Sequence, residues 1–139
     1  MTQSGPRRAV VLDSAALSAL AGWQGRETMV RLKVALEQAL PVVFPTVILA
    51  EVLTGSPSDA AVWRVVSQIT PVDLTLPLAA AAGGRRQRAE AVRKKKRDLT
   101  VDALVAATAI ACAPSLLVTA DSGDLGLLTA GADVKVVPV

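Results

Sequence analysis

The sequence contains no histidine and no tyrosine, and it has one cysteine, one phenylalanine and two tryptophans. Without histidine, the chain cannot use a histidine acid–base pair, a histidine-containing triad or a histidine–zinc site. So few aromatic rings also argue against a platform on which nucleic-acid bases stack. The single cysteine, Cys112, cannot form an internal disulfide, and its apolar neighbours indicate a core position. Any chemistry must therefore depend on carboxylates, hydroxyls, lysine and arginine.

Long apolar runs are absent as well. The chain is 52% hydrophobic, yet no run approaches the roughly 20 residues that a membrane helix needs. Arg7 and Arg8 precede an apolar patch, but Asp13 interrupts that patch too early for a secretory signal. With 139 residues, we expect a single domain (residues 1–139) with a flexible tail at residues 1–7 and a cytoplasmic location.

Basic residues are unevenly distributed along the chain. The net charge is only +3, but eight of the 15 lysines and arginines fall between positions 85 and 97. The rest of the chain is therefore slightly acidic. Such an asymmetry indicates a polyanionic partner that binds beside an acidic centre.

Short apolar segments alternate with segments of helical character. Strands are expected at 8–12, 42–44, 69–74, between Pro114 and Asp121, and at 135–137. Helices are expected at 14–21, 27–40, 46–54, 58–68, from Pro77 through the basic cluster, and from about Leu99. Gly83 and Gly84 mark a point where the long helix can bend or divide. Because every strand is short and continuously apolar, the pattern predicts an α/β fold, a three-layer α/β/α sandwich with a central parallel sheet.

Acidic residues follow two of these strands. Ligands of parallel α/β sheets bind beyond the carboxyl ends of the strands, so Asp13 and Asp121 should point into that crevice. Simpler explanations exist for single residues: Asp13 as a helix N-cap, Asp102 in the first turn of a helix, and Asp121 and Asp124 as turn residues. Neither explanation excludes the other at this stage.

Glu51 fits such simple explanations less well. Its helical neighbours Val47 and Ile48 are apolar, which predicts a buried glutamate, and glutamate is rarely buried without a partner. Asp102 shares its helix face with Val105 in the same way. A bound cation would explain both carboxylates.

The physics of clustered carboxylates favours a metal ion. Two like charges 4 Å apart repel by about 1 kcal/mol in water and by about 4 kcal/mol at an effective dielectric constant of 20. Clustered carboxylates would therefore be partly protonated unless a cation lay among them. Oxygen ligands without histidine or cysteine favour Mg²⁺ or Mn²⁺, which can activate a water for attack on a phosphodiester. Thr46, Thr119 and Ser14 either orient these carboxylates or have structural roles, as an N-cap, a strand end and a neighbour of Asp13.

These segments together make the chain resemble a PIN domain, and in particular a VapC-type toxin ribonuclease of bacterial toxin–antitoxin pairs. The segments that carry the resemblance are VVLDSAAL around Asp13, PTVILAEVLTG around Glu51, LTVDALVAATA around Asp102, and LLVTADSGDL around Asp121 and Asp124. The resemblance implies a Mg²⁺- or Mn²⁺-dependent endoribonuclease on a parallel five-stranded sheet with flanking helices. It also implies a homodimer and an antitoxin partner whose C-terminal segment crosses the active site.

The same resemblance assigns roles to the residues. Asp13, Glu51, Asp102 and Asp121 match the family's catalytic, metal-binding quartet, and Asp124 matches an additional, more variable acidic position. Thr119 lies where the family often has a hydroxyl residue. The basic cluster then becomes a candidate for contacts with RNA phosphates. The candidate residues are Arg85, Arg86, Arg93, Lys94, Lys95, Lys96 and Arg97.

Other functions fit the sequence less well or remain open. A phospho-acceptor receiver domain would need an acidic pair at the first strand, where Leu12 precedes Asp13, and an Asp-x-Asp phosphatase would need an acid at Ala15. The basic cluster could instead form a solvated face or bind an acidic stretch of the antitoxin. A housekeeping RNA-processing nuclease of the same fold, and a non-catalytic module that binds RNA or an antitoxin, stay open as alternatives.

Overall fold

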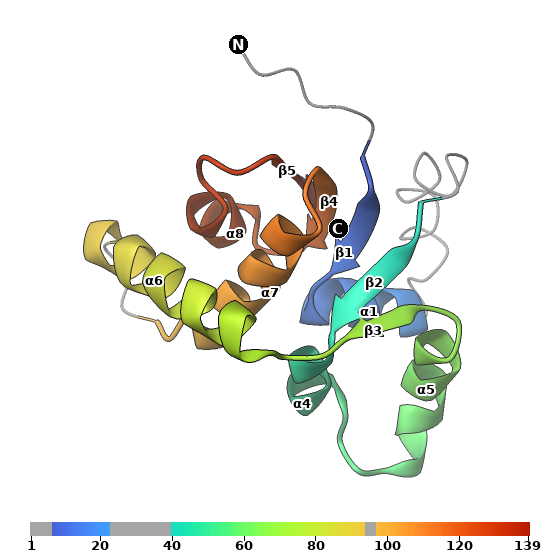
Figure 1. Ribbon diagram of the computed structural model, residues 1–139. Helices are drawn as coiled ribbons and strands as arrows, with labels where there is room; N and C mark the ends of the chain where they lie inside the picture. The colour runs from blue at the N-terminus through green and yellow to red at the C-terminus, as the bar shows by residue number, and fades with distance from the viewer. Residues whose placement is uncertain (1–6, 23–39, 94–96) are drawn as a thin grey trace.

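The chain forms a central sheet between two layers of helices in this computed structural model, which describes residues 7–22, 40–93 and 97–139 (Figure 1). All the strands of the sheet are parallel and lie in the order β3-β2-β1-β4-β5. The strands are β1 (Ala9–Leu12), β2 (Val42–Pro45), β3 (Thr70–Val72), β4 (Ser115–Thr119) and β5 (Val134–Pro138). The prediction of a three-layer sandwich around a parallel five-stranded sheet is therefore confirmed.

Helices connect the strands in two directions from the centre of the sheet. They are α1 (Ser14–Ala21), α4 (Leu49–Val52), α5 (Ala60–Val66), α6 (Leu76–Val92), α7 (Thr100–Ala111) and α8 (Ser122–Leu128), with short 3₁₀ turns η1 (Thr46–Ile48) and η2 (Pro57–Asp59). Right-handed crossovers in opposite directions place helices on opposite faces of a parallel sheet. In agreement, α1 contacts α5, whereas α7 contacts α6 and α8. Figure 1 shows α6 lying along the outer side of α7.

The middle of the sheet is completely buried. Val10, Val11 and Leu12 of β1 have no exposed surface, as expected for a central strand covered on both faces. Small side chains on α7, among them Ala103 and Ala106, are also buried. Because alanine allows close approach between elements, α7 can hold its first turn close to the carboxyl edge of the sheet.

The crossovers diverge between the two neighbouring strands β1 and β4. Leu12 at the end of β1 pairs with Val118 of β4, and the backbone N–H of Asp13 donates to the carbonyl of Val118 over 3.2 Å. The connections that leave these strands run in opposite directions, which opens a crevice at the carboxyl edge. This crevice is the expected position of a ligand.

Several predicted boundaries change in the structure. Helix α6 begins at Leu76, runs without a break through Gly83 and Gly84, and ends at Val92. The prediction that this helix continues to Arg97 is wrong at Arg93, which is its C-cap and adopts an extended backbone conformation, and at Arg97, which lies in no helix; residues 94–96 lie outside the described ranges. The turn expected around Asp121 and Asp124 is instead the start of helix α8, which Asp121 caps.

Some predictions concern residues outside the described ranges. The predicted helix at 27–40 lies almost wholly in this category, as do Lys94, Lys95 and Lys96. The predicted flexible tail does so too, except for Arg7. The Arg7 guanidinium forms an ion pair with Asp133 over 2.7 Å, so this residue is tied to the start of β5.

Candidate functional site

Asp13 is a buried carboxylate at the carboxyl end of β1. It caps α1, and its Oδ1 accepts a hydrogen bond from the backbone N–H of Ala16 over 2.8 Å. Burial raises the pKa of Asp13, while hydrogen bonds from the Thr119 side chain and from the backbone of Ala16, Ala120 and Ala15 act in the opposite direction. The N-cap role and a place in the crevice therefore both apply to this residue.

Thr119 connects two of the acidic residues. Its side chain is buried at the end of β4 and hydrogen-bonds to the carboxylate of Asp13. Its Oγ1 also accepts from the backbone N–H of Asp121 over 2.9 Å. One hydroxyl thus holds the ends of β1 and β4 in a fixed relation, consistent with its predicted role in orienting carboxylates.

Asp102 lies at the centre of the acidic residues. It is in the first turn of α7, and its side chain is 22% exposed. Burial is the main reason that the pKa of Asp102 rises to about 6; the charge of Arg97 lowers this pKa, and the carboxylates of Asp121, Asp13 and Glu51 raise it further. Asp13, Glu51 and Asp121 are therefore close enough to Asp102 to influence it electrostatically.

Asp121 and Asp124 come from the start of α8. Asp121 caps this helix, with its Oδ1 accepting from the backbone N–H of Asp124 over 3.1 Å. Partial burial acts to raise the pKa of Asp121, but the hydrogen bonds from Asp124 and the charges of Arg97 and Arg93 lower it overall. Helix α8 therefore presents two carboxylates toward the first turn of α7.

Two arginines neutralise these carboxylates. The Arg97 Nη2 lies 2.5 Å from Asp102 Oδ2, 3.1 Å from Asp124 Oδ2 and 3.2 Å from Asp121 Oδ2. The Arg93 Nε binds the other oxygen of Asp124, Oδ1, over 2.8 Å. Both arginines are predicted RNA contacts, and their pairing with carboxylates was not predicted. For Arg97, the short distance along the chain to Asp102 is a signal of this pairing.

Glu51 is near the acidic group but is not buried. It lies on the short helix α4, is exposed to solvent, and its Oε1 accepts a hydrogen bond from Ser14 Oγ over 2.5 Å. The prediction of a buried Glu51 is therefore wrong, because the apolar neighbour Ile48 is buried while Glu51 points outward. Its influence on the pKa of Asp102 nevertheless places Glu51 at the border of the crevice.

The loop after α4 is held by an acidic residue that the sequence analysis did not single out. Asp59 accepts hydrogen bonds from Thr54 N, Thr54 Oγ1 and Gly55 N, at 3.0, 2.8 and 2.8 Å. The Thr54 backbone bond is the main reason that the pKa of Asp59 is lowered. Gly55 has a φ of +80°, which suits glycine at this turn. Asp59 thus fixes the end of the segment that carries Glu51.

The remaining predicted site residues have mainly intramolecular contacts. Arg85 donates to the carbonyl of Ala130 over 2.7 Å, and Arg86 pairs with Glu90 on the same helix over 3.1 Å. Thr46 is the first residue of η1, and the N-cap position belongs to Pro45 instead. The contacts of the basic residues with RNA stay a prediction.

Three carboxylates form a group that could hold a metal ion. Among the described residues, Asp102, Asp121 and Asp124 each present one oxygen within 4.8 Å of the others. Asp13 and Glu51 border this group. An all-oxygen set of this kind suits Mg²⁺ or Mn²⁺. Burial and, to a smaller extent, the neighbouring carboxylates raise the pKa of Asp102, and a bound cation would favour its charged form. The residues present therefore fit a divalent ion.

Comparisons with known proteins agree with this architecture. A chain in the crystal structure of VapBC2 from Rickettsia felis bound to a promoter DNA fragment is similar, with a TM-score of 0.73, 15% identity, and coverage of 94% of this chain and 98% of that chain. A chain in the structure of FitAB bound to the IR36 DNA fragment has a TM-score of 0.62, 23% identity, and coverage of 93% and 94% respectively. At these identities the likeness shows the fold. The curated proteins gave no match.

Two further findings complete the comparison. Within the described ranges, none of the helices has both the length and the apolar character needed to cross a bilayer. The family model for the PIN domain matches residues 10–125, a span that includes all five acidic residues of the crevice. The chain belongs to the PIN domain family.

Proposed function

We propose that this protein is a metal-dependent endoribonuclease and acts as the toxin of a toxin–antitoxin pair. The observation that carries the proposal is the convergence of Asp13, Glu51 and Asp121, from three separate segments, on Asp102, whose pKa rises to about 6. Proteins with a PIN domain are generally nucleases, and membership of that family rests on most of the chain. The chain has no histidine, and the clustered carboxylates are the acid–base groups that the crevice offers for hydrolysis.

The residues divide into those that would bind the ion and those that would orient the reactants. Asp102, Asp121 and Asp124 would hold Mg²⁺ or Mn²⁺, and the bound ion would supply an activated water and stabilise the leaving oxygen. Asp13 and Glu51 border this group, as catalytic carboxylates that complete the ligand set or orient the water. Thr119 and Ser14 would keep these two side chains in position.

RNA would approach along the basic segment that leads to the crevice. The predicted contacts Lys94, Lys95 and Lys96 belong to this stretch of sequence and directly precede Arg97. Phosphate contacts of this kind position a nucleic acid without reading its sequence. Since the chain has few aromatic residues, recognition would depend on the shape of a folded RNA rather than on base stacking.

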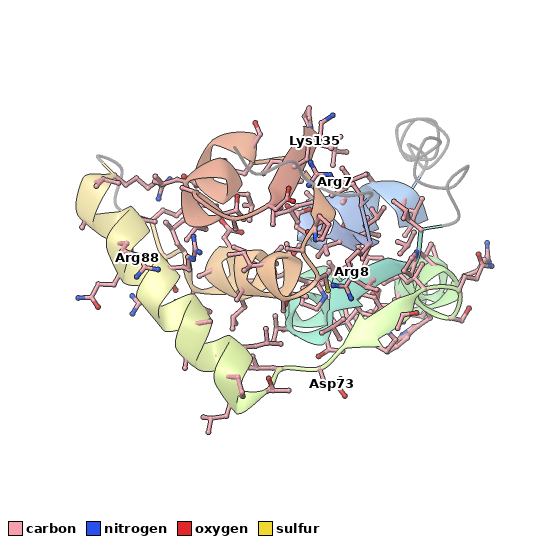
Figure 2. All side chains as sticks on the ribbon, turned by 45° about the horizontal axis from the view of Figure 1, so that its top comes forward. Arg7, Arg8, Asp73, Arg88 and Lys135 are labelled. Carbon is pink, nitrogen blue, oxygen red and sulfur yellow. The ribbon has the colours of Figure 1, made fainter. Side chains whose placement is uncertain are left out.

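Cleavage of structured RNA tests the nuclease. Purified protein is incubated with total RNA in Mg²⁺, Mn²⁺ or EDTA, and the new ends are mapped. Asp102→Asn and Asp13→Asn should each lower the cleavage rate by at least about 100-fold. Asp73→Asn is the matched control, because Asp73 is an exposed aspartate in the loop after β3 (Figure 2). Equal cleavage in EDTA, or by Asp102→Asn, would contradict the proposal.

The toxin role needs a separate test. It is supported by the likeness to chains of the VapBC2 and FitAB complexes, which suggests an antitoxin partner. A cytoplasmic location and a homodimer are further parts of this proposal. Induced expression should arrest growth, and Asp102→Asn should abolish the arrest. Co-expression of the product of a small neighbouring gene should restore growth, and this product should co-purify with the protein. Cleavage in vitro without growth arrest would instead favour a housekeeping nuclease.

A further inference from the structure

The Arg97 guanidinium occupies the position toward which three carboxylates point. All three of its contacts, with Asp102, Asp121 and Asp124, end on one atom, Nη2. These are the same three residues whose oxygens lie within 4.8 Å of one another. A cation that bound those oxygens together would have to take the place of this nitrogen.

Arg93 and Arg97 bind the acidic group in different ways. The side chain of Arg93 is 13% exposed and contacts Asp124 through Oδ1, the oxygen that Arg97 does not use. The side chain of Arg97 is 52% exposed and approaches the carboxylates from the solvent side. Arg93 can therefore remain in place while Arg97 leaves, because the two do not share an oxygen.

The backbone around Arg97 permits such a movement. The next residue, Asp98, is fixed at the start of α7, where its Oδ1 accepts from Thr100 N over 2.9 Å and from Thr100 Oγ1 over 2.6 Å. The long arginine side chain can thus turn toward solvent without disturbing α7 or Asp102. The cost of this movement is the loss of the three ion pairs with Asp102, Asp121 and Asp124, which solvent screens on the side of the half-exposed Arg97.

We propose that Arg97 is a built-in competitor of the divalent metal ion, a contact that keeps the acidic site closed until the ion displaces it. This inference rests on the proposed metal-dependent function. In the metal-free protein the guanidinium neutralises Asp102, Asp121 and Asp124. Binding of the ion to the same oxygens releases Arg97 to the mouth of the crevice, so metal binding and the position of Arg97 are coupled.

Metal affinity tests this competition without relying on nuclease activity. Mn²⁺ is titrated calorimetrically at pH 7 into the full-length wild type, Arg97→Gln, Arg88→Gln and Asp102→Asn. Removal of a competitor that makes three weak ion pairs should tighten Mn²⁺ binding about tenfold in Arg97→Gln. Arg88→Gln removes an equal charge from an exposed position on α6 and should leave the affinity unchanged.

Thermal unfolding provides a second readout. Without metal, Arg97→Gln should melt below the wild type, because its carboxylates then repel one another. Added Mn²⁺ should raise the melting temperature more in Arg97→Gln than in the wild type. If Arg97→Gln does not fold in EDTA, Arg97→Lys serves instead, and it should bind Mn²⁺ with an affinity between those of the wild type and a competitor-free site.

The possible results separate this inference from the proposed function. Binding of Mn²⁺ that depends on Asp102 but is equal or weaker in Arg97→Gln would overturn the competition and leave the nuclease proposal standing. If neither the wild type nor Arg97→Gln binds Mn²⁺ through Asp102, the proposed metal dependence fails and the competition fails with it. Tighter binding in Arg97→Gln, with Arg88→Gln unchanged, would support the competition.

Discussion

Asp13 and Asp124 occupy similar positions, but their carboxylates are stabilised by different kinds of partner. Each lies near the N-terminus of a helix that follows one of the two adjacent strands, and the residues are 6% and 8% exposed. Asp13 is held by neutral donors: the Thr119 side chain and backbone N–H groups. Asp124 is held by the guanidinium groups of Arg93 and Arg97.

The difference separates a fixed part of the site from an exchangeable one. Backbone donors around Asp13 are set by the strand ladder and the helix cap, so they cannot leave while the fold persists. A cation beside Asp124 can be replaced by another cation. The β1 side therefore provides a rigid frame, and the α8 side provides the place where charge is exchanged.

Arg93→Met should have the largest effect on stability, because it removes one of the two arginines that pair with Asp124. It leaves the buried Asp124 with only the exposed Arg97 as a partner, so we expect a loss of about 3 kcal/mol in the free energy of unfolding. Urea unfolding in EDTA measures this loss. Arg88→Met is the matched control, and a loss of equal size there would refute the assignment.

Thr119→Val removes one of the uncharged hydrogen-bond donors of Asp13. At pH 7 we expect a loss of about 2 kcal/mol, since both Asp13 and the backbone N–H of Asp121 lose a partner, whereas Thr119→Ser should be nearly neutral. The pKa of Asp13 is raised, so its contribution to stability is greatest at low pH and is lost as the pH rises through that pKa. The Thr119 bond favours the charged form, so the Asp13 part of the loss should shrink on acidification. A loss independent of pH would argue against this bond.

Asp102→Asn should stabilise the metal-free protein. The pKa of Asp102 is about 6, above its ordinary value of 3.8, so this group stabilises the fold below about pH 4 and loses that contribution as the pH rises to about 6. After allowance for solvent screening, we expect Asp102→Asn to gain about 1 kcal/mol at pH 7 and nothing at pH 3.5. Unfolding of both proteins across this range in EDTA measures the difference; a lower stability of Asp102→Asn at pH 7 would contradict it.

Arg86→Met should have the smallest effect on the free energy of unfolding. It provides a reference ion pair that lies outside the acidic site. The Arg86–Glu90 pair lies on the surface of α6 at helical spacing, where such pairs contribute about 0.3 kcal/mol. The loss in stability should also diminish in high salt. If Arg86→Met lowered the free energy of unfolding by more than about 1 kcal/mol, the exposure of the Arg86–Glu90 pair would not explain why it contributes less than the Arg93–Asp124 pair.

The periodic and acidic parts of the sequence predicted most of the architecture. Continuous apolar strands such as β1 predicted the buried parallel sheet, and the position of Asp13 and Asp121 after strands predicted the carboxyl-edge crevice. Helix α8 was missed because Gly123 and Gly126 lower helix propensity, while the cap from Asp121 and packing of Leu125 stabilise it.

The pairing of charges could not be predicted in the same way. The role of Arg93 depends on how the end of α6 meets the start of α8, which is a tertiary contact with no local signal. For Arg97, the short distance along the chain to Asp102 indicates one contact, but the pairs with Asp121 and Asp124 are again tertiary. The exposure of Glu51 likewise depends on the short η1–α4 segment, where one helical turn decides which side chain faces the core. Sequence patterns locate the carboxylates, but tertiary packing decides which cation each one meets.

The register between β1 and β4 has a consequence for the tolerance of the chain to insertions and deletions. Leu12 pairs with Val118, and both strands end within a residue of that pair. Because side chains alternate between the two faces of a sheet, one residue added to or removed from β1 would turn its remaining side chains to the wrong face and move Asp13 away from Asp121. The exposed turn at Gly131, which leads into β5, carries no such constraint. Length is therefore strictly constrained at the centre of this sheet and free at its margin.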